Sequence, residues 1–185
     1  MPTASSSFLR HPRPIGPQPR RSGALPLVLG LDPGLSRTGY AALQAGGGRP
    51  RIREAGVLVT RSRDDLGSRL HQLYRDVEGL FQELRPDLVV LEDLFVHRAF
   101  PRTAIVLGHA RGIIYLAAAA ARVRVMALAP SVVKQVVTGS GRASKAQVQA
   151  AVRTLLSLRV LSDSHAADAL ALAYAGLSRI GSVRR

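Results

Sequence analysis

The stretch Leu27–Asp32 is a run of apolar residues that ends in a single carboxylate, and Pro33 and Gly34 follow it at once. A short apolar run closed by turn residues predicts a strand that is buried on both faces. Because an unpaired carboxylate in a protein core costs several kcal/mol, we expect Asp32 to lie at the open end of this strand. There it serves either as a turn residue or as a ligand for a positively charged group.

The remaining patterns alternate between strands and helices. Two further strands, expected at residues 38–43 and 51–60, follow the first one closely and predict an antiparallel meander. Farther along, three- and four-residue steps of apolar residues predict helices, and short apolar runs predict strands. We expect helices at residues 64–84, 102–122, 131–138, 144–158 and 165–178, and strands at 87–92 and 123–128. This order predicts one α/β domain, residues 26–180, with a mixed five-stranded sheet flanked by helices.

The segments outside this domain are polar and basic. Residues 1–25 are rich in Pro, Ser and Arg and lack apolar periodicity, so we expect a disordered basic extension. A translation start assigned too far upstream would give the same pattern. Residues 181–185 are expected to be a basic tail. The sequence lacks a run of ~18–20 apolar residues and the apolar core of a secretory signal, so we expect a cytoplasmic protein without membrane contact.

The charge of the chain is strongly unbalanced. There are 26 Lys and Arg residues against 12 Asp and Glu residues, a formal net charge of +14. This imbalance favours a polyanionic partner such as nucleic acid, although a non-specific basic surface would have the same composition. The chain has no cysteine, which excludes disulfides and thiolate metal sites. Any metal must therefore be held by carboxylates and histidines.

Four side chains fall where an α/β sheet forms its functional sites. Asp32 ends the first predicted strand and Glu92 ends the fourth, and sites in such sheets form at the carboxyl ends of strands. His165 and Asp168 are three residues apart, which places both on one face of the last predicted helix. Together they predict a two-metal site for phosphodiester hydrolysis, with the ions ~4 Å apart.

Each of these residues also has an ordinary structural explanation. Asp93 is an alternative to Glu92 as the second acid, but Glu92 is preferred because Asp93 begins the loop. His165 is also compatible with a solvent-exposed position in the first turn of its helix. The helix dipole would favour any acid at Asp168, and Asp163 is compatible with a simple helix cap.

Several sequence blocks together resemble the RuvC-type Holliday junction resolvases. They match in order and spacing from Leu27 to about Ser178, and they are GLDPGLSRTGYA, LVVLEDLF, LGHARGIIYLAAA, SVVKQVVTGSGRASKAQVQAAVRTLL and HAADALALA. The resemblance implies a ribonuclease H-like fold and a homodimeric, metal-dependent endonuclease of recombination and repair. Such an enzyme resolves four-way (Holliday) junctions by paired symmetric nicks that leave 5′-phosphate and 3′-hydroxyl ends. A branch-migration helicase complex is the partner that the resemblance implies.

The resemblance also assigns the metal ligands. It places the first, second and last family acids on Asp32, Glu92 and Asp168, around two divalent ions, Mg²⁺ or Mn²⁺. The remaining position is commonly Asp and here is His165, a variation that the family also shows. Because imidazole favours Mn²⁺ over Mg²⁺, we predict better activity with Mn²⁺. His165 must be unprotonated to bind a metal, so activity should fall as the pH drops through the titration range of histidine.

Basic residues near the expected site are candidates for DNA contacts. Lys134 and Lys145 are the two lysines of the chain, and both match positions where the resembled family uses lysine near DNA. Lys145 follows Ser144, which stands with Gln147 at the spacing of a capping box. The free N–H groups at such a helix start favour phosphate, although an ordinary solvated lysine would fit there too. Weaker candidates for phosphate contacts are Arg98, Arg102, Arg111 and Arg142.

An aromatic residue follows Glu92 closely. Phe95 and Phe100 lie in the basic segment LFVHRAF, which is expected to be an exposed loop. The resemblance places the family's junction-centre aromatic on Phe95, where a ring can stack on an unpaired base for ~1–3 kcal/mol. A core position is the common alternative for phenylalanine. If Phe95 stacks on the junction, Phe95→Ala should reduce cleavage far more than junction binding.

A junction with two-fold symmetry calls for two equivalent active sites, which a C2 dimer supplies. The helix expected at residues 102–122 carries Gly108, Ala110, Gly112 and Ala117. These small residues suggest that it forms the dimer interface, although a helix packed in the core would show them as well.

Other functions fit parts of the sequence. LGLDPGLSRTG also resembles the phosphate loop of actin-like ATPases and sugar kinases, but those proteins need two such lobes and the chain has 185 residues. A junction-binding protein without catalysis and a nuclease of the same fold that acts on RNA are further alternatives. ATP binding, metal-dependent nicking and a panel of RNA and DNA substrates would distinguish them.

Overall fold

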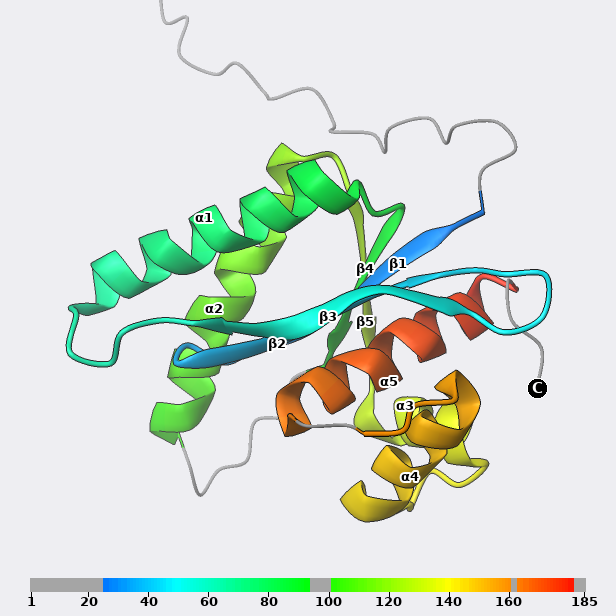
Figure 1. Ribbon diagram of the computed structural model, residues 1–185. Coiled ribbons are helices and arrows are strands. Elements are labelled where there is room, and N and C mark those ends of the chain that lie inside the picture. Colours follow the sequence, from blue (N-terminus) through cyan, green and yellow to red (C-terminus); the bar gives the residue numbers. More distant parts are fainter. Residues whose placement is uncertain (1–24, 94–100, 161–162, 182–185) are drawn as a thin grey trace, which may run out of the picture.

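The computed structural model describes residues 25–93, 101–160 and 163–181, with only the backbone described at 101–103. The elements in chain order are β1 (Leu27–Asp32), β2 (Arg37–Gln44), β3 (Arg51–Val59), α1 (Leu66–Leu84), β4 (Leu88–Glu92), α2 (Pro101–Ala120), β5 (Arg124–Leu128), α3 (Pro130–Thr138), α4 (Lys145–Leu156) and α5 (Ser164–Arg179) (Figure 1). Every predicted strand and helix is present, with ends that lie within a turn of the expected positions. The predicted mixed α/β architecture is confirmed.

The five strands form one sheet in the order β3-β2-β1-β4-β5. β1 pairs antiparallel with β2, and β2 pairs antiparallel with β3, which is the predicted meander. On its other side β1 pairs in parallel with β4, and β4 pairs in parallel with β5. The carboxyl ends of β1, β4 and β5 therefore meet at one edge of the sheet.

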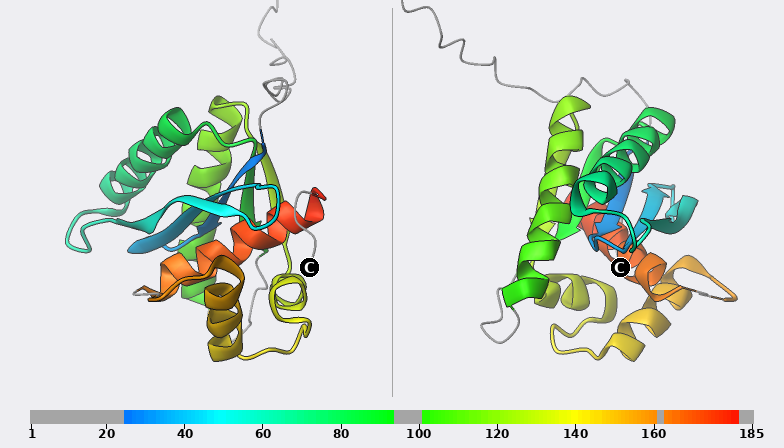
Figure 2. Two further views of the ribbon diagram at one scale, coloured as in Figure 1. Left: turned by 45° about the vertical axis from the view of Figure 1, so that its right-hand side comes forward. Right: turned by 90° about the vertical axis from the view of Figure 1, so that its left-hand side faces the viewer.

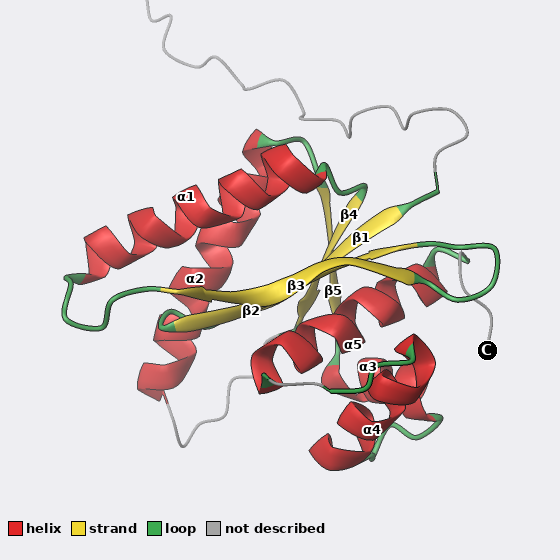
Figure 3. Ribbon diagram, viewed as in Figure 1, coloured by secondary structure: helices red, strands yellow, loops and turns green. Residues whose placement is uncertain are grey.

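Helices cover both faces of the sheet (Figures 2 and 3). α1 and α2 pack on one face, over Leu29 and Leu31 of β1. α5 packs on the other face with α3 and α4 beyond it, over Val28 of β1 and Val90 of β4. Alternate residues of β1 thus enter two separate cores, which explains why its sequence is apolar without a polar face.

Two glycines let α5 lie directly on the sheet. A Cβ atom at Gly30 of β1 would be 2.1 Å from the carbonyl oxygen of Ala169, and one at Gly39 of β2 would be 2.1 Å from that of His165. No side chain fits in either gap, because real Cβ atoms do not approach other atoms so closely. These contacts fix the first half of α5 against the carboxyl end of β1.

The helix starts follow the signals in the sequence. The Asp65 side chain accepts a hydrogen bond from Ser68 N and begins α1, one of the two acids expected there. Ser144 and Gln147 form the predicted capping box at the start of α4. Within the described ranges, none of the helices combines the length and the apolar character needed to cross a membrane.

The small residues of α2 divide between two faces. Ala110 and Ala117 are buried in the core between α2 and the sheet. Gly108 and Gly112 are exposed, and a Cβ added at either one would contact nothing within 4 Å. The packed-core explanation therefore holds for the two alanines, and only the glycines lie where a partner could reach them.

Candidate active site

The two strand-end acids lie on neighbouring strands and on the same face of the sheet. Leu31 of β1 is paired with Leu91 of β4, and Asp32 and Glu92 are the next residues of their strands. Since side chains alternate along a strand and Leu31 and Leu91 face α1 and α2, both acids face α5. Strand pairing alone therefore brings these two carboxylates together.

The start of α5 brings the other two predicted residues to the same place. Asp163 caps the helix by accepting hydrogen bonds from the backbone N–H groups of His165 and Ala166. The same carboxylate forms an ion pair of 2.5 Å with Arg37 at the start of β2. The cap, the ion pair and the close approach at Gly39 together fix the first turn of α5 against the sheet. The alternative that Asp163 is a helix cap is confirmed.

Two polar contacts join the predicted metal ligands to one another and to α4. His165 Nδ1 lies 3.0 Å from Asp32 Oδ2. Lys145 Nζ donates a hydrogen bond of 2.7 Å to Asp168 Oδ2, so the start of α4 is tied to α5. His165 is thus half-buried against Asp32 and is not an isolated solvent-exposed residue.

The carboxylates are crowded enough to affect one another's protonation. Burial raises the pKa of Asp32, and the charge of Asp168 raises it further, while the hydrogen bond from His165 opposes both effects. Burial also raises the pKa of Glu92, as do the charges of Asp32 and Asp168, and Lys134 and Lys145 partly offset this. Carboxylates whose negative charges raise each other's pKa are stabilised in the ionised form by a cation that lies between them.

A pocket of about 280 Å³ opens beside these acids. It is lined by Asp32, Pro33, Glu92, Asp93, Leu107, Arg111 and Pro130. Proline and leucine form its apolar part, while the acids and one arginine supply its charges. The pocket therefore opens onto two of the four predicted ligands, Asp32 and Glu92.

Arg111 departs from its predicted role. The sequence makes it a weak candidate for a phosphate contact, but only 10% of its side chain is exposed. Its Nη1 donates to the backbone carbonyl of Glu92, its Nη2 lies 3.9 Å from Asp93 Oδ1, and its guanidinium lies 5.7 Å from the centre of the Tyr115 ring. Arg111 is thus a buried group that holds the end of β4, because α2 places its guanidinium against the Glu92 carbonyl.

The remaining predicted DNA contacts fall into two groups. Lys134 in α3 is close enough to influence Glu92, and Arg142 lines a larger pocket of about 720 Å³ between α3 and α4. Phe95 and Arg98 lie outside the described residues, and so does the side chain of Arg102. Arg37 and the positioning role of Arg111 escaped the sequence analysis because each depends on contacts between residues far apart in the chain.

The donor set suits a hard divalent cation. Three carboxylates and an imidazole converge, and carboxylate oxygens with imidazole nitrogen bind Mg²⁺ and Mn²⁺. Within residues 25–93, 101–160 and 163–181, no three acidic or histidine side chains stand close enough to enclose an ion as they are. The residues therefore fit a metal by their chemistry.

Known proteins share this sequence and this fold. The family model described as crossover junction endodeoxyribonuclease RuvC matches residues 28–175. RuvC of Rhodopirellula baltica is 45% identical over 157 residues, which cover 84% of this chain and 88% of that protein. RuvC of Syntrophomonas wolfei is 41% identical over 147 residues, or 79% of this chain and 85% of that protein.

Solved structures give the same result. The Thermus thermophilus RuvC structure superimposes with a TM-score of 0.77 at 31% identity, covering 85% of this chain and 98% of that one. The same values hold for that protein in complex with a Holliday junction substrate. The yeast mitochondrial Holliday junction resolvase, at 14% identity and a TM-score of 0.63 over 87% of this chain and 82% of that one, shares the fold. These matches confirm the ribonuclease H-like fold, and the chain belongs to the RuvC family of crossover junction endodeoxyribonucleases.

Proposed function

We propose that this chain resolves four-way DNA junctions by paired symmetric nicks with two divalent ions at Asp32, Glu92, His165 and Asp168. The observation that carries the proposal is the convergence of these side chains from β1, β4 and α5 at one edge of the sheet. A Thermus thermophilus relative with the same fold has been solved with a Holliday junction substrate. The net charge of +14 suits such a polyanionic substrate.

The residues of the site have separate tasks. When bound, the divalent ions supply an activated water and stabilise the leaving oxygen of the phosphodiester. Asp32, Glu92 and the pair on α5 would hold the ions through their carboxylate oxygens and the imidazole nitrogen. Asp32 Oδ2 accepts a hydrogen bond from His165 Nδ1, and this contact orients the imidazole. Arg111 fixes the backbone of Glu92 and so limits where its carboxylate can point.

Lys145 is placed to contact the scissile strand. Its side chain is 60% exposed while its ammonium is bonded to Asp168, and this hydrogen bond raises the pKa of Lys145, which keeps the ammonium charged at neutral pH. An exposed cation beside metal ligands is suited to a phosphate oxygen next to the bond that is cut. Lys134, Arg142, Arg98 and Arg102 are proposed for the flanking phosphates, and Phe95 for stacking at the junction centre.

The proposed dimer uses the exposed face of α2. Ile105 and Leu116 of this helix are 59% and 58% exposed, and Gly108 and Gly112 lie between them at steps of three and four residues. Apolar side chains that flank glycines allow two helices to approach closely across a two-fold axis. Two sites related by that axis would cut two symmetric strands. A branch-migration helicase as partner and a cytoplasmic location complete the proposal.

Cleavage of a labelled synthetic four-way junction tests this function. The protein is incubated with the junction in Mg²⁺, in Mn²⁺ or with a chelator, beside a linear duplex and an RNA junction. The proposal expects paired symmetric nicks in the DNA junction that a ligase reseals, and faster turnover in Mn²⁺ because of His165. Equal or faster turnover in Mg²⁺ at saturating metal would contradict the metal preference. Binding without cutting in every divalent ion would contradict catalysis.

A further inference from the structure

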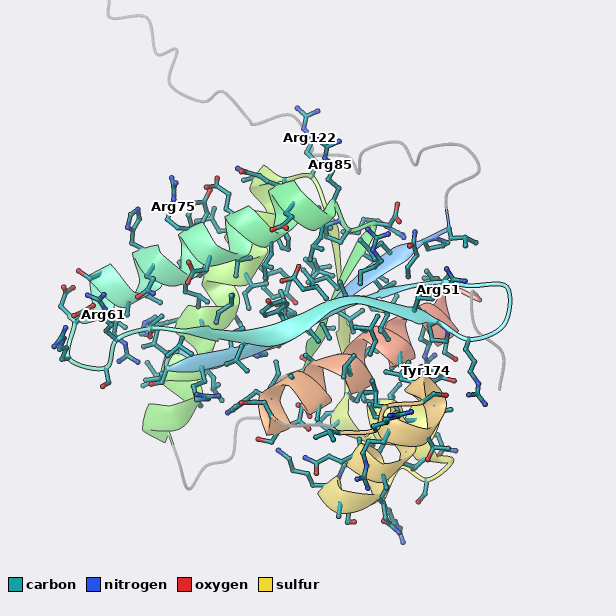
Figure 4. The ribbon with its side chains drawn as sticks, in the orientation of Figure 1. Arg51, Arg61, Arg75, Arg85, Arg122 and Tyr174 are labelled. Atoms are coloured by element: carbon teal, nitrogen blue, oxygen red, sulfur yellow. The ribbon has the colours of Figure 1, made fainter. Side chains whose placement is uncertain are left out.

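The end of the sheet opposite the acids carries a separate group of arginines. β3 begins with Arg51 and β5 with Arg124, while Arg85 and Arg122 directly follow α1 and the last turn of α2. All four side chains are exposed. Figure 4 shows Arg85 and Arg122 at the end of the molecule where α1 and α2 both end in Figures 1 and 2, with Arg51 farther along the same end. We call these four residues the arginine face.

The strand register places this face across the whole sheet. Arg51 is paired with Gln44, Gln44 with Leu27, and Leu88 with Arg124. Because neighbouring strands lie ~4.8 Å apart, four such steps separate the two edge arginines by roughly 19 Å. B-DNA carries one charge per ~1.7 Å of axis, so this width faces on the order of ten phosphate charges of a duplex.

The charges of the arginine face have no partner among the residues that the structure describes. Within the described part of the chain, none of the four side chains forms a hydrogen bond or an ion pair, whereas Arg37, Arg69 and Arg75 all do. The neighbouring acid Asp87 accepts a hydrogen bond from Leu27 N.

Backbone conformation gives a second, independent observation. Arg85 has φ of 49° and Arg122 has φ of 57°, in the left-handed region where helices commonly end in glycine. An L-residue there costs ~1 kcal/mol relative to glycine. A cation near a helix C-terminus recovers a similar amount, about 0.3–1 kcal/mol, through the helix dipole. At Arg85 and Arg122, the cost of the left-handed backbone and the gain from the helix dipole therefore roughly cancel, so arginine does not stabilise the fold there. The helix dipole does not act on Arg51 or Arg124, which begin strands.

From these observations we infer that the arginine face binds the sugar-phosphate backbone of a second DNA duplex, separate from the junction at the acids. β4 runs from Leu88 to Glu92, so the two ends of the sheet are ~13 Å apart along this strand before side chains are added. Duplex DNA has a persistence length of ~150 base pairs, so an arm held at the acidic end does not bend back to the other end within a few turns.

The test measures capture of a second duplex by a protein whose junction site is already filled. Asp168→Asn protein is saturated with an unlabelled four-way junction, and a fluorescent linear duplex is then titrated at several salt concentrations. The informative variant adds Arg85→Gly and Arg122→Gly, which remove two charges and also relieve both left-handed arginines. Its melting temperature should therefore be equal or higher, which separates a binding defect from misfolding. Arg75→Gln, on the exposed side of α1, is the charge-matched control for one residue.

We expect the Asp168→Asn protein to capture the duplex and the double glycine variant to bind it ~tenfold more weakly. The slope of log K against log salt should fall by ~0.9 for each phosphate contact that is lost. Junction binding should be the same in the two Asp168→Asn proteins. Junction cleavage is measured separately with Asp168 intact, so failure of the proposed nuclease function is distinguished from failure of this inference. The inference is overturned if no duplex is captured, if the double glycine variant captures it equally well, or if Arg75→Gln loses as much per charge.

Discussion

The two ends of the sheet differ in the sign of their charged side chains and in how far those side chains are buried and paired. At the carboxyl end, Asp32 and Glu92 are half-buried and repel each other. Neighbouring groups such as His165 and Lys145 partly offset the negative charge of these acids. At the amino end, the arginines are exposed and lack side-chain partners among the described residues. The acidic end is built by contacts between distant segments, so it is sensitive to single changes. The arginines at the basic end act through their charge, so we expect each substitution there to weaken DNA binding by a small, salt-dependent amount.

The largest expected effect is on the acidic end. Asp168→Asn removes a charged ligand from α5 while keeping the shape of the side chain, and cleavage should fall by at least ~10³-fold. Junction binding should persist, since it depends on the basic residues. Cleavage of a labelled junction under single-turnover conditions measures the loss. Asp65→Asn is the matched control, because asparagine also caps helices and Asp65 is remote from the site. Full activity of Asp168→Asn would remove that residue from the site.

The second prediction concerns the packing of α5 on the sheet. Gly30→Ala places a Cβ against the backbone of α5, 2.1 Å from Ala169 O and 2.6 Å from Ala173 N. Backbone cannot move aside as a side chain can, so the free energy of unfolding should fall by about 3 kcal/mol. Urea denaturation measures it, and Gly47→Ala, which meets nothing within 4 Å, is the control. If both variants were equally stable, the close packing of α5 on β1 would be wrong.

The third prediction addresses Arg111 as a positioning residue. Arg111→Met keeps the volume but removes the hydrogen bond to the Glu92 carbonyl, and kcat should drop ~10–100-fold, as when outer-shell partners are lost. The KM for junction should change little, because Arg111 is buried and does not supply an exposed phosphate contact. Arg111→Lys should recover part of kcat, since lysine can donate to the same carbonyl. An increase in KM with unchanged kcat would instead assign Arg111 to DNA binding.

The smallest effect is a pH dependence of stability. The pKa of Glu92 is raised in the folded state, so protonation favours folding, and this contribution is complete below the unfolded pKa. It is lost as the pH rises through the folded pKa, where the buried carboxylate ionises. Glu92→Gln should therefore be as stable as the parent protein at low pH and more stable at neutral pH, by ~2 °C in melting temperature. Thermal scans from pH 4 to 8 without divalent ions measure this; a parallel pH profile for both proteins would contradict it.

How far the sequence predicts this molecule depends on the range of the interactions. Asp32 and Glu92 were predictable because each ends an apolar strand, and alternation along the strand decides which way it points. His165 and Asp168 were predictable from helical spacing. The pair between Lys145 and Asp168 joins residues 23 positions apart on different helices, and Arg111 is 19 positions from Glu92. No local pattern encodes such contacts, so the buried role of Arg111 was missed. The splitting of the α2 small residues into two faces likewise required the position of the sheet.

The most direct test of the central claim is a crystal structure of the protein crystallised with Mn²⁺, with diffraction data collected at the manganese absorption edge. The account predicts two anomalous peaks ~4 Å apart, bounded by Asp32, Glu92, His165 and Asp168, with Lys145 released from Asp168. Asp168→Asn crystals should lose at least one peak. Full Mn²⁺ occupancy elsewhere in the molecule, with no peak between these four side chains, would contradict the assignment of this end of the sheet as the nuclease site.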